Sequence, residues 1–423
     1  MLKQFRGLVM GIEQKKWILI MGGGFLTIPM YVKCKKMGVN ILAFEWDMAA
    51  PALKFADQTM RVNLKDMEDV RRNALKAGEQ FPIGGVVTCG ADIEIAVAVA
   101  TEALGLLGIS VQAAIDCNDK VAMRKKLDAT GLADTLWAEV ATVDEAISAA
   151  DKIGYPCFFK PIDNCGSRGC KRITSAEDIR EWWGEVIVFS VNAGHRAMIE
   201  EYVDGPRQTI EMIVEDGTPY LVSIIDTHYI YEEPEKYPFG NWPVETGLNI
   251  TELSKDKQQH LFEHSARVVK AMGVNFGPVK VDTTISSKGI QTIELTARLS
   301  GGFHCQYATP LAYGTDEISA VAQMALGEGL DKELIRHKFE RTSVVLAKFP
   351  ESGKIVEISG LEEAKGLPGV KEVFVFRGEG DVVAPYRNST DRVAFVIADG
   401  ETLEEAKRNA QLGVDTLIIK TQE

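Results

Sequence analysis

The sequence lacks three features that would point to a membrane, to a nucleic acid or to secretion. Its apolar runs fall short of the roughly 18 residues that a membrane-spanning helix needs. Acidic residues outnumber basic ones, 60 against 47, and a formal net charge of −13 disfavours a nucleic-acid-binding surface. The opening MLKQFRGLVMGIEQKK has no long apolar segment followed by a small-residue cleavage site, so we expect no secretory signal.

Cysteine and dinucleotide-binding patterns are also sparse. The seven cysteines are scattered, and Cys165 with Cys170 has no second pair at zinc-like spacing, so we expect reduced thiols in a cytoplasmic protein. The glycines in GGGFLT (22–27) lack the G-x-G-x-x-G spacing, which makes a dehydrogenase the weakest functional reading. Neither an internal repeat nor a low-complexity tract is evident.

What the sequence does contain is a regular order of secondary-structure patterns. Its 423 residues suggest two to four domains. Strand-like segments at 16–24, 39–47 and 84–90 alternate with helix-like segments, including 93–105, which predicts a parallel sheet near the N-terminus.

The pattern changes near Asp116. We expect helices at 116–132, 142–154 and 254–272, a long loop at 227–247, two strands in GPVKVDTTIS and GIQTIELTARLSGG, and a small α+β unit from about 341.

The stretch FFKPIDNCGSRG (158–169) joins a strand that ends in Lys160 to a flexible turn. Gly166, Ser167 and Gly169 are common in ordinary turns. The same composition also suits a loop whose backbone N–H groups hold phosphate beside a lysine. We expect the Lys160 side chain to end in a solvent-accessible site.

A second cluster lies on the two later strands. Glu294, Thr296 and Arg298 are separated by even numbers of residues, so their side chains point to one face of a strand. If Asp282 lies on the paired strand, two carboxylates converge there. Carboxylates gathered in this way favour Mg²⁺, which shares its oxygen ligands with substrate phosphates.

At these residues the chain resembles the ATP-grasp superfamily, in its carboxylate–amine (L-amino-acid ligase-like) branch. The segments DKVAMRKKL, FFKPIDNCGSRG, IEEYVDGPRQTIE and GPVKVDTTIS…IELTARLSGG carry the resemblance, with the tail KIVEISG…LPGV…DRVAFVIADGETLEEA. The resemblance implies an α/β and α+β chain with an ATP-grasp fold. It implies four domains: a Rossmann-like pre-ATP-grasp domain at 1–115, a lid at 116–198, a nucleotide and metal subdomain at 199–340 and a C-terminal α+β domain at 341–423.

The resemblance also implies roles for particular residues. The ATP phosphates would be contacted by Lys120, Lys160, Gly166, Ser167 and Gly169, and the adenine by Glu200, Glu201 and Val203. Asp282 and Glu294 would hold Mg²⁺, with Mn²⁺ as an alternative. Arg298 and Lys160 would be the catalytic residues. Two positions depart from the family pattern. Thr296 stands where asparagine is common, and Arg207 stands where many members have a ribose-binding glutamate.

The implied function is an ATP-dependent ligase that joins a small carboxylate to an amine through an acyl phosphate. Loop 227–247 and the turn at 300–307 would line the substrate pocket, with Glu245, His228, Ser300, Gly301 and His304 as candidate contacts. A homodimer is the habit of the family. The alternatives are a biotin carboxylase-like or phosphoribosylglycinamide synthetase-like enzyme and, more distantly, a non-catalytic nucleotide-binding protein.

Overall fold

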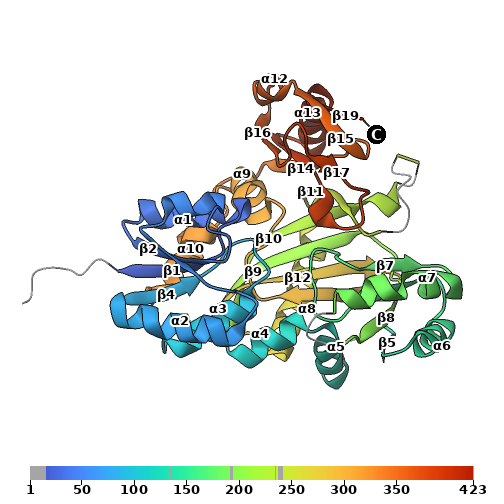
Figure 1. Cartoon of the computed structure of the whole chain (residues 1–423), viewed down its shortest axis with the longest axis horizontal. Coiled ribbons are helices and arrows are strands. Elements are labelled where there is room, and N and C mark those ends of the chain that lie inside the picture. The colour runs from blue at the N-terminus through green and yellow to red at the C-terminus, as the bar shows by residue number, and fades with distance from the viewer. Residues whose placement is uncertain (1–15, 133–134, 191–193, 234, 237–241, 423) are drawn as a thin grey trace, which may run out of the picture.

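The computed structural model describes residues 16–132, 135–190, 194–233, 235–236 and 242–422. Figure 1 shows a unit of parallel strands at the left, a long central sheet, a smaller sheet with two helices at the right, and the C-terminal part above the centre. Within these described ranges, no helix combines the length and the apolar character that a membrane crossing requires.

The N-terminal unit confirms the expected parallel sheet. Its strand order is β3-β2-β1-β4, and every pairing is parallel. The apolar strands are buried because helices cover the sheet. The elements are β1 (Trp17–Met21), α1 (Ile28–Lys36), β2 (Asn40–Glu45), β3 (Gln58–Arg61), α2 (Met67–Gln80), β4 (Ile83–Val87) and α3 (Glu94–Ala103).

The helix expected at 116–132 is two helices, which corrects the sequence prediction. α4 (Val111–Asn118) ends before Asp119, and α5 (Lys120–Ala129) begins directly after it. The break is at Asp119 because its extended backbone interrupts the helix while its side chain accepts a hydrogen bond from the Ala122 N–H and caps the new one. Lys120 therefore stands in the first turn of a new helix.

The lid unit is a four-stranded antiparallel sheet of order β5-β8-β6-β7 with two helices on it. Its β6–β7 hairpin carries the loop that follows Lys160. The elements are β5 (Trp137–Val140), α6 (Val143–Ile153), β6 (Cys157–Pro161), β7 (Lys171–Ile173), α7 (Ala176–Val188) and β8 (Ala197–Glu201).

The central sheet has eight strands in the order β13-β12-β9-β10-β11-β14-β18-β16, and all its pairings are antiparallel. Strands from the tail continue the sheet without a break, so the proposed boundary at 340/341 does not coincide with a gap in it. The strands are β9 (Arg207–Glu215), β10 (Thr218–Tyr229), β11 (Glu245–Ile250), β12 (Gly277–Ser286), β13 (Gly289–Thr296), β14 (Thr342–Lys348), β16 (Val370–Val375) and β18 (Ala394–Gly400).

The remaining elements complete the central and C-terminal parts. They are α8 (Lys255–Met272), the π-helical η5 (His304–Ala308), α9 (Thr309–Tyr313), α10 (Glu317–Ala325), α11 (Lys332–Ile335), β15 (Gly353–Ser359), α12 (Leu361–Lys365), β17 (Val382–Val383), α13 (Leu403–Thr416) and β19 (Ile418–Gln422).

The loop expected at 227–247 is shorter than the sequence suggested. Residues up to Tyr229 belong to β10 and residues from Glu245 belong to β11, because the two strands pair with each other across the ends of the loop. Residue 234 and residues 237–241 lie outside the described residues.

Candidate active site

Two adjoining hollows lie between the lid unit and the central sheet. The first hollow is lined by Lys120, Phe158, Lys160, Asn164, Cys165, Ser167, Cys170, Glu200, Glu201, Val203, Arg207, Gln208, Thr209, Thr227, Tyr229, Tyr231, Pro243, Asp282, Thr283, Ile293 and Glu294. The second hollow shares part of that wall, including Asp282 and Glu294, and extends toward both the N-terminal and the C-terminal units.

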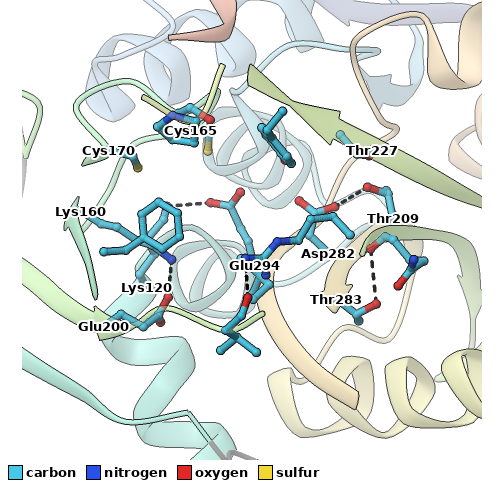
Figure 2. A pocket seen from close by; sticks show the side chains of 18 of the residues that line it. Lys120, Lys160, Cys165, Cys170, Glu200, Thr209, Thr227, Asp282, Thr283 and Glu294 are labelled. Carbon is cyan, nitrogen blue, oxygen red and sulfur yellow. Dashed lines mark hydrogen bonds and ion pairs between the residues drawn. The ribbon is translucent and has the colours of Figure 1, made fainter. Parts of the chain in front are cut away.

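The shared wall is built by the pairing of β12 with β13. Asp282 and Glu294 are direct partners across the two strands, which confirms the expected convergence of their carboxylates. Asp282 accepts a hydrogen bond from Thr209 Oγ1 at 2.7 Å and forms an ion pair with Lys280. In Figure 2, Glu294 lies between Asp282 on one side and the lysines on the other.

The lysine side of the first hollow is held by buried ion pairs. Lys120 Nζ lies 2.7 Å from Glu294 Oε1 and donates a hydrogen bond to the Asn164 carbonyl oxygen at 2.6 Å. Lys160 pairs with Glu200, whose other oxygen lies 2.7 Å from Arg124 Nε. Lys160 is only 7% exposed, so the expectation of a solvent-accessible side chain is wrong. It lies inward because Glu200 is buried beneath it.

The ion pairs keep both carboxylates ionised. Burial acts to raise the pKa of Glu200, but Arg124 and Lys160 outweigh it and lower that pKa to about 2. Burial opposes ionisation of Glu294 in the same way. The charge of Lys120, and to a smaller extent that of Lys280, outweighs burial and holds the pKa of Glu294 below its usual value. The first hollow therefore carries fixed negative charge, which is compensated by lysines and by Arg124.

The β6–β7 loop is bent by residues in the left-handed region. Gly166, Ser167 and Gly169 have φ values of 66°, 61° and 73°. A Cβ on Gly169 would lie 2.7 Å from the Phe189 ring, so a side chain does not fit there. Ser167 lines both hollows and Gly166 lines the second, whereas Gly169 lines neither and shapes the turn.

The residues expected to contact adenine line the first hollow. Val203 and Glu201 line it, and Glu201 also pairs with Lys288. Glu200 reaches the hollow too, but its carboxylate is engaged by Lys160 and Arg124. Arg207 donates a hydrogen bond to the Val203 carbonyl oxygen at 2.8 Å and lines the same hollow.

Arg298 enters the second hollow and is held by a residue of the N-terminal unit. Its guanidinium lies 2.5 Å from Asp92 Oδ1, and Arg168 of the β6–β7 loop lies 3.0 Å from Asp92 Oδ2. Burial acts to raise the pKa of Asp92, but the two arginines outweigh it and lower that pKa. One carboxylate thus links Arg298 to the loop.

The C-terminal part supplies the opposite side of the second hollow. Arg392 lies 2.9 Å from Glu245 Oε1, and Ser389 Oγ accepts a hydrogen bond from the Glu245 N–H at 3.3 Å. The Ser389 N–H donates to the Gly166 carbonyl oxygen at 3.2 Å. The short turn around Ser389 therefore contacts both the loop and a predicted substrate residue.

Of the remaining substrate candidates, the structure brings Ser300, Gly301 and His304 into the second hollow but not His228. His228 precedes Tyr229 on β10, and neighbouring strand residues point to opposite faces of the sheet. Its Nε2 lies 2.7 Å from Asn249 Oδ1, in a separate surface hollow beside α13. The sequence prediction for His228 failed to account for this strand.

The carboxylates of the shared wall fit a metal ion that takes its other ligands from the substrate. Asp282 and Glu294 offer carboxylate oxygens on the shared wall, and the described residues contain no cluster of three or more His, Cys, Asp or Glu suited to a metal. Mg²⁺ is bound in this manner, by one or two carboxylates plus substrate phosphates. Thr296 lines neither hollow and its hydroxyl is buried, so it does not extend the set.

The sequence analysis did not identify several charged residues that line the two hollows or pair with residues lining them. Lys280 stands two residues before Asp282, and the even spacing was a usable signal. Asp92 follows a parallel strand at its carboxyl end, where ligand-binding residues gather. Arg124 and Arg392 had no comparable local signal, because their partners lie 76 and 147 residues away.

Two family models match the chain. The carbamoyl-phosphate synthase L chain ATP-binding domain matches residues 119–333, and the L-amino acid ligase C-terminal domain 2 matches residues 348–422.

Similar proteins extend over nearly the whole chain at low identity. The crystal structure of an L-amino acid ligase from Bacillus licheniformis superposes with a TM-score of 0.81 and 22% identity, covering 97% of this chain and 100% of that one. The crystal structure of a phosphoribosylglycinamide synthetase from Anaerococcus prevotii superposes with a TM-score of 0.72 and 19% identity, covering 96% of this chain and 100% of that one. A formate-dependent phosphoribosylglycinamide formyltransferase of Bacillus subtilis is 22% identical, over 96% of this chain and 100% of its own length.

Proposed function

We propose that this chain, which belongs to the family of the carbamoyl-phosphate synthase L chain ATP-binding domain and is an ATP-grasp ligase, joins an amino acid to an amine through an acyl phosphate. The observation that carries the proposal is the wall shared by the two hollows. A nucleotide in the first hollow and a carboxylate in the second would meet beside Asp282 and Glu294.

Lys120 and Lys160 would bind the phosphates from one side, and the backbone of the β6–β7 loop would cover them. Phosphoryl transfer needs mainly positioning and compensation of charge, which these buried cations supply. Asp282 and Glu294 would hold Mg²⁺, which when bound neutralises charge on the phosphate oxygens. The carboxylate substrate, placed in the second hollow, then attacks the γ-phosphorus and ADP leaves.

Arg298 would bind the acyl phosphate, because its guanidinium reaches the second hollow and carries a fixed charge there. An amine then attacks the carbonyl carbon and phosphate departs. Glu245 would orient the incoming ammonium. The contacts of Gly166 and Arg168 with the C-terminal and N-terminal units would keep the loop closed and water out during this step.

The substrate class is inferred from three features. Residues 348–422 match the C-terminal domain of L-amino acid ligases. Glu245 and Arg392 form a cation–anion pair at the second hollow that is complementary to the ammonium and carboxylate of an amino acid. Beyond it, a largely apolar groove is lined partly by Phe25, Trp46 and Phe376, which suits an apolar side chain.

A second candidate function is ligation of a phosphorylated amine. Curated relatives matching over 92% or more of this chain include several formate-dependent phosphoribosylglycinamide formyltransferases. Arg392 suits a phosphate as well as a carboxylate, so the two candidate functions are distinguished by which substrates the enzyme accepts.

The deciding experiment is phosphate release measured across a matrix of carboxylates and amines with ATP and Mg²⁺, with each product identified by mass spectrometry. We expect amide formation with pairs of amino acids. Release that depends on formate and a phosphorylated amine would favour the second candidate, and release that depends on bicarbonate and biotin would favour a carboxylase. Failure of every pair, with ATP still bound, would indicate a non-catalytic nucleotide-binding protein.

Three secondary proposals accompany this one. The four domains begin at residues 1, 116, 199 and 341, Mn²⁺ can replace Mg²⁺, and the chain forms a homodimer. Limited proteolysis, metal titration of the active assay and light scattering test them in turn.

A further inference from the structure

A buried polar cluster lies beneath the second hollow. His304 lines the hollow at the start of η5 and is 2% exposed. Its Nε2 lies 3.2 Å from Ser223 Oγ and 3.6 Å from Glu211 Oε2. These are the hydrogen-bond and ion-pair contacts of the ring among the described residues, and both are made by Nε2. The Nδ1 atom is therefore the ring atom left for a ligand in the hollow.

Glu211 lies in the middle of β9 and is fully buried. Its Oε1 accepts a hydrogen bond from the Ser300 N–H at 2.7 Å, whereas Oε2 has no hydrogen-bond partner among the described residues. A buried carboxylate oxygen without a donor costs free energy. A proton arriving on Oε2 would remove that cost.

The surroundings set the charge states of the pair. Burial raises the pKa of Glu211 to about 7, while burial and Lys280 lower the pKa of His304 to about 3. His304 is thus neutral, and Glu211 takes up or releases a proton near neutral pH. The titratable and charged groups that face the pair come from β12, the end of β13, η5 and α10: Lys280, Arg298, Cys305 and Glu317.

The proposed ligation needs a place for a proton. An amine arrives as an ammonium ion, which has no lone pair and cannot attack the acyl phosphate until a proton leaves. We propose that His304 and Glu211 form a relay that removes this proton: His304 Nδ1 accepts it from the ammonium, while the proton on Nε2 passes to Glu211 Oε2. This inference rests on the proposed function and adds a role that substrate contact alone would not give His304.

The step balances without a further reactant. The ammonium loses one proton to the relay, and the nitrogen lone pair forms the new bond to the carbonyl carbon. The bond from that carbon to the phosphate oxygen breaks, the departing phosphate takes the second proton from nitrogen, and an amide remains. Glu211 then returns its proton to solvent through His304 when the product leaves.

Hydroxylamine separates proton removal from the rest of the reaction, because it is largely unprotonated at neutral pH and attacks acyl phosphates directly. Glu211→Gln keeps the shape of the side chain but accepts no proton. With the preferred amine we expect kcat to fall about 100-fold, within the usual range for general base catalysis. With hydroxylamine, whose product is measured as hydroxamate, we expect kcat to change less than threefold. We expect His304→Gln to show the same difference between the two acceptors.

Ser223→Ala is the matched control, because it removes a contact of Nε2 without a titratable group. We expect it to affect both acceptors equally. In the wild type the amine reaction should gain rate as pH rises through about 7. In Glu211→Gln that limb should disappear.

Two results would overturn the relay. One is an equal loss with amine and hydroxylamine in both variants, and the other is a pH limb near 7 that persists in Glu211→Gln. If neither variant folds, the wild type still decides, since a limb near 7 that is identical for both acceptors contradicts the relay. A wild type that forms neither amide nor hydroxamate would instead refute the proposed function.

Discussion

The two hollows share a wall but are built differently. Charges at the first hollow are paired within the lid and the central sheet: Lys120 with Glu294, and Lys160 and Arg124 with Glu200. At the second hollow, Lys280 and Asp282 pair on the shared wall, and the other charges are paired between units: Asp92 of the N-terminal unit holds Arg298 and Arg168, and Arg392 of the C-terminal part holds Glu245.

This difference teaches where common chemistry and selectivity would reside. A site whose charges are compensated locally is organised before any second substrate binds, which suits a nucleotide used in every turnover. A site closed by residues from separate units changes whenever one of those units changes. Substitutions in the first hollow should therefore affect all reactions alike. Those in the second should affect substrates unequally, except at Arg298, which would bind the acyl phosphate common to every reaction.

The largest expected effect is from Lys160→Met. Loss of a phosphate-binding cation should reduce ADP formation by about a thousandfold for every substrate pair. The variant should also unfold at a lower temperature, because buried Glu200 loses one of the two ion-pair partners that the described residues give it and keeps Arg124. Coupled ADP assays and thermal melting measure the two effects, and exposed Lys255→Met is the control. Near-normal ADP formation would remove Lys160 from the machinery.

Arg298→Ala tests whether one residue of the second hollow belongs to the common chemistry. We expect kcat to fall about 100-fold for all pairs, since the acyl phosphate is common to them. ATP affinity, measured by calorimetry, should change little. A loss confined to some substrate pairs would show that Arg298 contributes to substrate selection and not to the chemistry common to all pairs.

Glu245→Ala and Arg392→Ala should act on the amine substrate. Loss of a charge-assisted hydrogen bond costs about 1.5–3 kcal/mol, so KM for the amine should rise roughly 10- to 150-fold with nucleotide affinity intact. The double variant should lose less than the sum, because the two side chains contact each other. Additive losses, or weakened ATP binding, would contradict a shared amine site.

The same contrast explains what the sequence could reveal. Asp282 and Glu294 were predictable because residue spacing on consecutive strands sets their faces, and the structure confirms that they are cross-strand partners. The fold was predictable for a different reason, because several motifs in order resemble those of the ATP-grasp superfamily. Arg392 was not, since only tertiary packing brings it to Glu245. His228 was expected near the substrate because residues 227–247 were predicted to form a loop. It belongs to β10, where neighbouring side chains point to opposite faces of the sheet.

Glu294→Gln should produce a smaller effect, on the stabilisation that magnesium adds to nucleotide binding. ATP with Mg²⁺ should raise the melting temperature more than ATP alone, because ligands that bind the folded state stabilise it by mass action. The variant should lose most of that increment, whereas Glu252→Gln, at an exposed site, should keep it. Retention of the full increment by Glu294→Gln would place the metal elsewhere.

The smallest effect concerns how stability depends on pH, and it tests the buried carboxylate beneath the second hollow. Burial raises the pKa of Glu211 to about 7 in the folded protein, above the value of 4.5 for an exposed glutamate. The folded state therefore holds a proton that the unfolded state releases, and its advantage is lost as pH rises from about 4.5 to about 7.

Within that window the wild type should lose about 1.4 kcal/mol of unfolding free energy per pH unit from this group, and Glu211→Gln should not. The unfolding free energy of Glu211→Gln minus that of the wild type, measured in urea, should thus rise from pH 5 to pH 7 and then stay constant. Glu215→Gln, on the same strand but half-buried, should follow the wild type. Parallel curves for wild type and Glu211→Gln would mean that Glu211 is ionised throughout this range, which would also remove the proton acceptor on which the relay depends.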